Sequence, residues 1–155
     1  MIPPTIYRVE IYDKDKKTKT LRFVQDVKHI QIVNRHFQIF ALASQVYVYK
    51  NWTEIFDCLR TAPNERGTFA CASFQGDEHR LILITIGEKS KCQVQIKDYV
   101  LARDFTIDEV FGDDVENPKE TIGDMVIEDM GERLLIVNTN GTHLRTYSMR
   151  DIREK

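Results

Sequence analysis

The side chains best suited to chemistry are spread along the chain and form no recognisable constellation. The four histidines (His29, His36, His79 and His143) have no cysteine or acidic residue beside them at the spacing of a metal site. The sequence also contains no Gly-x-Ser-x-Gly nucleophile motif and no glycine-rich phosphate loop. We therefore expect a protein that is not an enzyme and that holds no metal ion and no cofactor.

Composition indicates in which compartment the protein resides and which classes of partner it can attract. The 155 residues carry a formal net charge of −2, so the whole molecule has no electrostatic attraction for nucleic acid, and contact with an anionic membrane would need a local basic patch. Cys58, Cys71 and Cys92 form no Cys-x-x-Cys pair and are odd in number, which favours reduced thiols and small buried side chains over a disulfide framework. No apolar run is long enough to span a membrane, and the first residues show no hydrophobic signal segment. We expect a cytoplasmic protein.

Alternation of apolar and polar residues dominates the chain, and a helical period is nearly absent. One alternating, aromatic-bearing strand pattern recurs four times, at roughly the 40 to 50 residue spacing of four-stranded propeller blades. The four copies are residues 7–12 (YRVEIY), 46–50 (VYVYK), 94–98 (VQIKD) and 144–148 (LRTYS). The pattern predicts an all-β fold, a WD40-like β-propeller segment of about three blades that forms an incomplete ring.

Turn residues divide this segment. We predict the end of one blade over residues 1–25, two whole blades over 26–61 and 62–106, an acidic loop over 107–120, and most of a further blade over 121–155. The apolar run 81–84 is expected to be a central strand buried on both faces, and Asn140-Gly141 indicates a tight hairpin. The lysine-rich residues 13–19 are predicted to form a turn, and residues 54–60 one outer strand.

An acidic segment separates the last two groups of strands. Residues 104–120 contain seven acidic side chains and one basic side chain. A solvated connection between blades explains this composition, and a calcium site is the alternative. The spacing lacks the pattern of an EF-hand loop.

Several of these stretches resemble the PROPPIN family, the WIPI-type seven-bladed β-propellers of autophagy. Residues 61–73 (TAPNERGTFACAS) resemble the entry to a family blade, residues 93–96 (QVQI) the strand that follows, and residues 141–148 (GTHLRTYS) a later hairpin. The resemblance runs in order through most of the chain. It implies an arc with two open edges, so that either the remainder of a propeller or edge-to-edge self-association is expected to cover them.

The resemblance also implies a lipid site. Family members bind phosphatidylinositol 3-phosphate or 3,5-bisphosphate membranes beside an FRRG-like motif, because the guanidinium fork suits phosphate. Arg145 and Thr142 match a family arginine and threonine, and Asn138 stands where the family has a serine. The chain ends before the position of FRRG, and the family histidine falls near Pro118, so only an incomplete pocket is expected. The alternative for Arg145 is a hairpin residue that caps neighbouring loops.

The basic turn at Arg35 and His36 resembles the region of the family in which autophagy proteins dock, although such turn residues are often simply solvated. Two functions follow from the resemblance. The first is a phosphoinositide-directed scaffold of autophagy, peripheral at autophagic or endosomal membranes. The second is a protein-interaction propeller that does not bind lipid.

Overall fold

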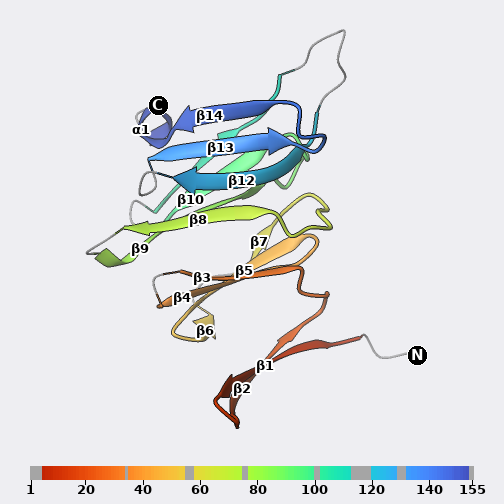
Figure 1. Ribbon diagram of the computed structural model, residues 1–155, viewed down its shortest axis with the longest axis vertical. Helices are drawn as coiled ribbons and strands as arrows, with labels where there is room; N and C mark the ends of the chain where they lie inside the picture. The colour runs from red at the N-terminus through yellow and green to blue at the C-terminus, as the bar shows by residue number, and fades with distance from the viewer. Residues whose placement is uncertain are drawn as a thin grey trace.

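Fourteen strands and one short helix make up the described part of the chain. The computed structural model describes the backbone of residues 5–33, 35–54, 58–74, 77–99, 102–112, 120–128 and 132–153, with side chains throughout except for 73–80 and 153. The strands form four antiparallel sheets, sheet A to sheet D, which follow one another in chain order. The sheets stack along the long axis of the molecule (Figure 1).

Sheets A and B lie at the N-terminal end of the stack. Sheet A has the order β1-β2, and sheet B has the order β3-β4-β5-β6, with β7 also paired to β5. Their strands are β1 (Tyr7–Asp13), β2 (Lys16–Phe23), β3 (His29–Val33), β4 (Phe37–Ala41), β5 (Gln45–Lys50), β6 (Thr53–Glu54) and β7 (Leu59–Arg60).

Sheets C and D complete the stack. Sheet C has the order β11-β10-β9-β8, and sheet D has the order β12-β13-β14. Their strands are β8 (Phe69–Phe74), β9 (Asp77–Ile86), β10 (Val94–Asp98), β11 (Arg103–Ile107), β12 (Ile122–Glu128), β13 (Arg133–Asn138) and β14 (Leu144–Ser148), and the helix α1 (Met149–Arg153) follows.

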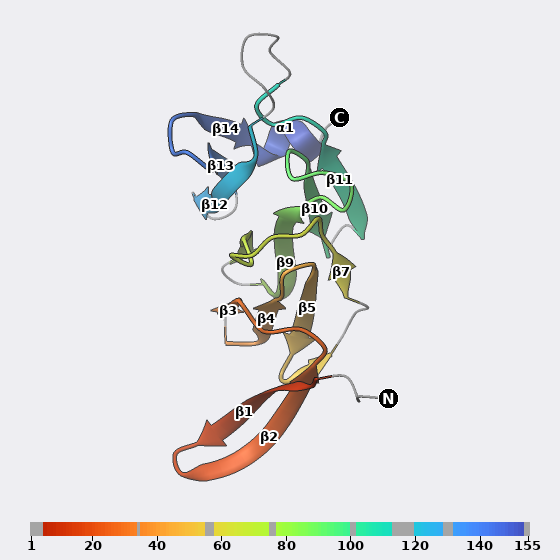
Figure 2. The same ribbon diagram turned by 90° about the vertical axis from the view of Figure 1, so that its right-hand side faces the viewer.

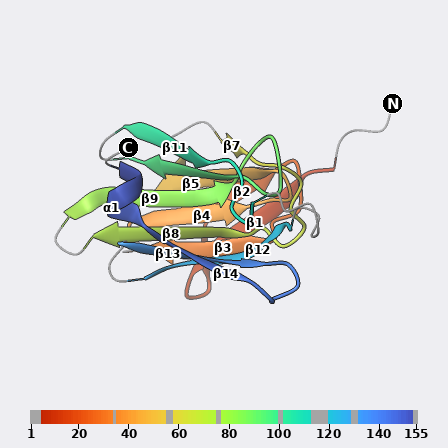
Figure 3. The ribbon, with the colours of Figure 1, turned by 90° about the horizontal axis from the view of Figure 1, so that it is seen from above.

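A separate apolar cluster fills each junction between consecutive sheets. Phe23 of sheet A packs against Phe40 of sheet B with ring centroids 5.4 Å apart. Sheets B and C share a cluster that includes Ile39 and Leu83, and sheets C and D share a third that includes Ile84 and Ile136. Figures 2 and 3 show the resulting stack from the side and along its length, with the sheets following one another in chain order. This radial packing confirms the predicted propeller segment, since no sheet closes on itself.

The central strand of sheet C is buried as predicted. Leu81, Ile82, Leu83 and Ile84 are each at most 1% exposed, because alternate side chains of β9 enter the clusters on its two faces. The three cysteines are free thiols. Cys92 is buried, whereas Cys58 and Cys71 are only partly buried.

One local prediction was wrong. The lysine-rich stretch is not a long turn: the chain reverses at Lys14 and Asp15, and residues 16–23 form β2, paired to β1. Its lysine side chains stay exposed, so pairing the backbone requires no burial of charge. Of the outer strand predicted over 54–60, the structure describes both ends, β6 and β7, which pair with opposite ends of β5, whereas residues 55–57 lie outside the described residues.

Some predictions fall outside the described residues. These are the part of the acidic loop over 113–119 and the family histidine position at Pro118; Asn34, which precedes Arg35 in the basic turn, is likewise not described.

Candidate functional site

The residues predicted to make contacts lie at opposite ends of the strands. Arg35 and His36 form part of the turn between β3 and β4, on the left of Figure 1, whereas Asn138 and Thr142 border the connection from β13 to β14 on the right. The two candidate surfaces are therefore separate, and one ligand of ordinary size would not touch both.

Asn138 organises the connection between β13 and β14. Its side chain is buried, with 1% exposed. Its Oδ1 accepts hydrogen bonds from the backbone N–H of Thr142 at 2.8 Å and of His143 at 3.0 Å, and its Nδ2 donates to Thr142 Oγ1 at 2.9 Å. The family resemblance implied that Asn138 and Thr142 belong to one lipid site, and the structure places their side chains in contact. The Asn138 amide is, however, engaged in shaping the turn.

His143 and Glu120 lie beside this turn. His143 Nδ1 is 3.1 Å from Thr142 Oγ1 and 3.2 Å from the Glu120 carboxylate. A carboxylate at this position opposes binding of phosphate by Coulomb repulsion.

Arg145 lies on the exposed edge strand of sheet D. Its register partner is Ile136, so its side chain belongs to the face of sheet D that packs on sheet C. Its charge acts on Tyr147, whose pKa is raised by burial and lowered to a smaller degree by Arg145. Within the described residues, no hydrogen bond or ion pair joins Arg145 to Asn138 or Thr142.

The turn at Arg35 and His36 is hydrogen-bonded to a second turn, formed by Asn51 and Trp52. Arg35 has a φ of 61° and is exposed. The His36 carbonyl accepts the N–H of Asn51 at 2.7 Å, and Gln38 Oε1 accepts the N–H of Trp52 at 2.8 Å. Lys19 of sheet A donates to the Trp52 carbonyl. These bonds hold the two turns as one surface, on which Arg35 presents a positive charge.

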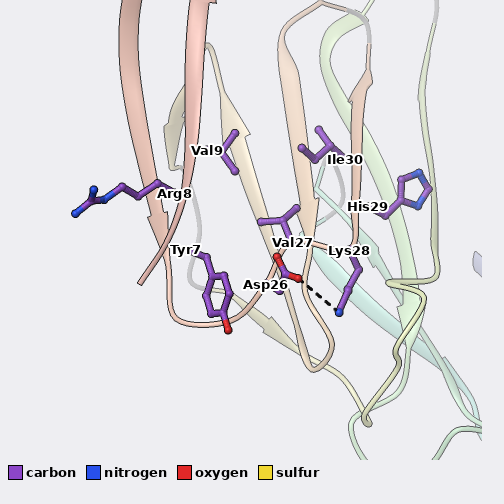
Figure 4. A pocket seen from close by; sticks show the side chains of 8 residues that line it. All are labelled: Tyr7, Arg8, Val9, Asp26, Val27, Lys28, His29 and Ile30. Atoms are coloured by element: carbon purple, nitrogen blue, oxygen red, sulfur yellow. Dashed lines mark ion pairs between the residues drawn. The ribbon is translucent and has the colours of Figure 1, made fainter. Parts of the chain in front are cut away.

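Sequence reasoning did not identify the groove shown in Figure 4. This cavity of about 540 Å³ separates β1 from the entry to β3, and its lining includes Tyr7, Val9, Val27 and Ile30. Ile30 and Ile32 are two residues apart and therefore share one face of β3, but whether that face stays open depends on how far sheet A extends over sheet B.

A smaller cavity of about 210 Å³ lies where the link to β8 meets β12. Arg66 and Lys91 border it together with Glu65, Thr121 and Thr139. Its mixed charges define no ligand class.

Neither a metal site nor a membrane-spanning helix is present in the described residues. They include no group of three or more His, Cys, Asp or Glu side chains placed to share an ion. Among them, no helix has the length and apolarity that a membrane crossing needs.

Comparison with known proteins relates this arc to larger propellers. No model of a known protein family matches the chain, and no curated protein matches it. Solved structures do match. Hsv2 of Kluyveromyces lactis aligns with a TM-score of 0.68 at 13% identity over 92% of this chain and 41% of its own. The Kluyveromyces marxianus Hsv2 gives a TM-score of 0.67 at 17% identity over 92% and 42%.

A third match is Atg21 solved in complex with the coiled coil of Atg16, with a TM-score of 0.66 at 12% identity over 91% of this chain and 43% of its own. Hsv2 and Atg21 are PROPPINs. This chain has the fold of part of a PROPPIN propeller. It spans about two fifths of the length of these structures, which agrees with the incomplete ring predicted from its sequence.

Proposed function

We propose that this chain is part of a PROPPIN-type scaffold of autophagy, one that binds partner proteins through the surfaces of its blades and does not catalyse a reaction. One observation carries the proposal: 91–92% of the chain aligns with the PROPPIN fold, including an Atg21 that was solved with the Atg16 coiled coil. The expected location is the cytoplasm, at the surface of autophagic or endosomal membranes.

The surface that we propose for partner binding is the pair of linked turns around Arg35 and His36. Hydrogen bonds between the turns hold them in place before a partner binds, which lowers the entropy cost of association. An exposed arginine suits the acidic positions on the outer face of a coiled coil.

Binding of the purified Atg16 coiled coil, measured by titration calorimetry, tests this proposal. Arg35→Asn removes the charge and keeps a residue that tolerates positive φ, so we expect a loss of affinity of about tenfold with the fold intact. Arg22→Asn, at an exposed site on β2, is the matched control and should bind normally. Equal affinity of both variants and the unchanged protein would remove Arg35 from the interface, and absence of binding by the unchanged protein would contradict the proposal.

Phosphoinositide binding is the second candidate. Its support is the exposed Arg145 on an open edge of sheet D, at a position that resembles a family phosphate ligand. The hydroxyl of Thr142 lies in the turn that precedes this strand. The Asn138 amide already has its partners within the turn, so Arg145 and Thr142 are the residues that we expect to contact a phosphate.

Flotation with liposomes that contain phosphatidylinositol 3-phosphate or 3,5-bisphosphate tests this candidate. Arg145→Ala should reduce the floated fraction, whereas Arg133→Ala, exposed at the far end of the same sheet, should not. If the unchanged protein does not float but still binds the coiled coil, the protein-interaction propeller without lipid binding is the better description.

A further inference from the structure

The hairpin of sheet A carries its closed end away from the neighbouring sheet. Strands β1 and β2 pair along their length, and the chain reverses at Lys14 and Asp15. Figures 1 and 2 show the closed end pointing away from sheet B. Lys19 still contacts sheet B, because it donates to the Trp52 carbonyl in the turn between β5 and β6. We refer to residues 12–19 as the lysine tip.

The lysine tip is basic and hydrated. Residues 12–19 contain four lysines and two aspartates, which gives the tip a net charge of +2 in a chain whose net charge is −2. Every side chain from 12 to 19 is exposed. Among the described residues, no ion pair engages Lys14, Lys16 or Lys17. Burial of unpaired ammonium groups under another sheet would be costly, so the tip is a surface that faces solvent and not a junction between blades.

An aromatic ring lies among these charges. Tyr12 is 54% exposed, and its hydroxyl donates to the Glu10 carboxylate at 2.8 Å. Tyr12 is the register partner of Lys17, so the ring and the ammonium group share one face of the hairpin. Tyrosine rings favour the headgroup level of a bilayer, which is also the level at which lysine meets lipid phosphate.

These side chains suit a lipid surface better than a partner of fixed shape. Lysine is a hydrated point charge on a flexible stem, and it is depleted at the cores of protein interfaces. One exposed ring does not make the row of stacking platforms that single-stranded nucleic acid uses. An anionic bilayer requires neither a pocket nor a matching shape, and each lysine close to its surface adds to the attraction.

We propose that the lysine tip binds the surface of anionic bilayers, such as those that contain phosphatidylserine, by charge and without a headgroup pocket. The tip lies at the lower left of Figure 1, far from the connection between β13 and β14 at the upper right, so this contact is separate from the phosphoinositide candidate at Arg145 and Thr142. The proposal does not rest on the proposed function. The coiled-coil titration and the Arg145→Ala result can therefore fail without affecting it.

Flotation with phosphatidylcholine liposomes, with and without phosphatidylserine and free of phosphoinositide, tests the proposal. We expect the unchanged protein to float only with phosphatidylserine, and less as salt screens the attraction. The double variant Lys16→Gln/Lys17→Gln should bind about tenfold more weakly. Lys89→Gln/Lys91→Gln removes two exposed lysines from the connection between β9 and β10. This control has the same net charge as the tip variant and should bind like the unchanged protein.

A charge-preserving variant separates loss of charge from loss of fold. Lys16→Arg/Lys17→Arg keeps both positive charges and should float like the unchanged protein, and circular dichroism of all variants checks that the sheets are intact. Absence of flotation with phosphatidylserine, or an equal loss in the tip variant and the control, would overturn the proposal. Binding of a single-stranded RNA by the lysine tip without flotation would assign the tip to nucleic acid instead and would also overturn it.

Discussion

Asn138 holds Thr142 through two hydrogen bonds, accepting its backbone N–H at 2.8 Å and donating to its hydroxyl at 2.9 Å. The same side chain also accepts the N–H of His143 at 3.0 Å. A residue that resembled a phosphate ligand in the sequence is therefore the structural centre of a turn. It can still influence a ligand, by fixing where Thr142 and the start of β14 lie.

Substituting Asn138 with alanine should destabilise sheet D. The change leaves two backbone N–H groups without their acceptor, and we expect a loss of about 1–3 kcal/mol in the free energy of unfolding. Urea titration followed by circular dichroism measures it. Asn140→Ala, at an exposed position of the same turn, is the control and should cost much less. Similar midpoints for the two variants would show that the hydrogen bonds of Asn138 contribute little.

Gly67 should not tolerate a side chain. Its φ is +64°, and a Cβ there would lie 2.8 Å from the Lys28 Cβ and 3.2 Å from the Ala41 Cβ. Gly141 has a similar φ of +72° but open space around it. Alanine at Gly141 should therefore cost about 1 kcal/mol for the backbone conformation, and alanine at Gly67 should cost more because sheets B and C must also shift. Thermal unfolding of both variants measures the difference, and equal losses would argue against the steric contribution.

Truncation within the central strand of sheet C should be costly. Ile84 is 0% exposed and belongs to the cluster shared with sheet D. Ile84→Ala should lower the free energy of unfolding by about 2–5 kcal/mol, the sum of lost burial and a residual cavity. Val24→Ala, at a side chain that is 64% exposed, is the control and should cost well under 1 kcal/mol. Urea unfolding of the pair checks this, and comparable losses would mean that Ile84 is not buried between sheets C and D.

Alkaline pH should weaken the junction between sheets A and B. Burial, with a smaller contribution from Glu54, raises the pKa of Tyr49 from 10.0 to about 12. Folding therefore favours the neutral phenol, and its stabilising contribution is complete below pH 10 and is lost as pH rises toward 12. Unfolding of the unchanged protein and Tyr49→Phe across this range should show a smaller loss in the variant, because phenylalanine does not ionise. Identical pH profiles would mean that Tyr49 ionises equally in both states.

The alternating pattern of the sequence determined the class of fold. Residues such as Val46 and Val48 recur every second position, and that spacing places them on one face of a strand whatever the surroundings. The continuous run at Leu81–Ile84 likewise required two covered faces. The local pattern did not predict the structure of residues 13–19, because lysine is compatible with either a turn or an exposed strand. Pairing with β1 makes most of this stretch a strand.

Tertiary structure alone decided which apolar faces stay open and which polar side chains remain available. Phe40 and Ile30 are equally apolar in the sequence and share a face of sheet B, yet only Phe40 lies beneath sheet A. Asn138 and Arg145 both resembled phosphate ligands, yet the first is enclosed by its own turn and the second is exposed at an edge. Sequence pattern assigns a side chain to a face, but burial and hydrogen bonding depend on what packs against that face, and those neighbours come from distant parts of the chain.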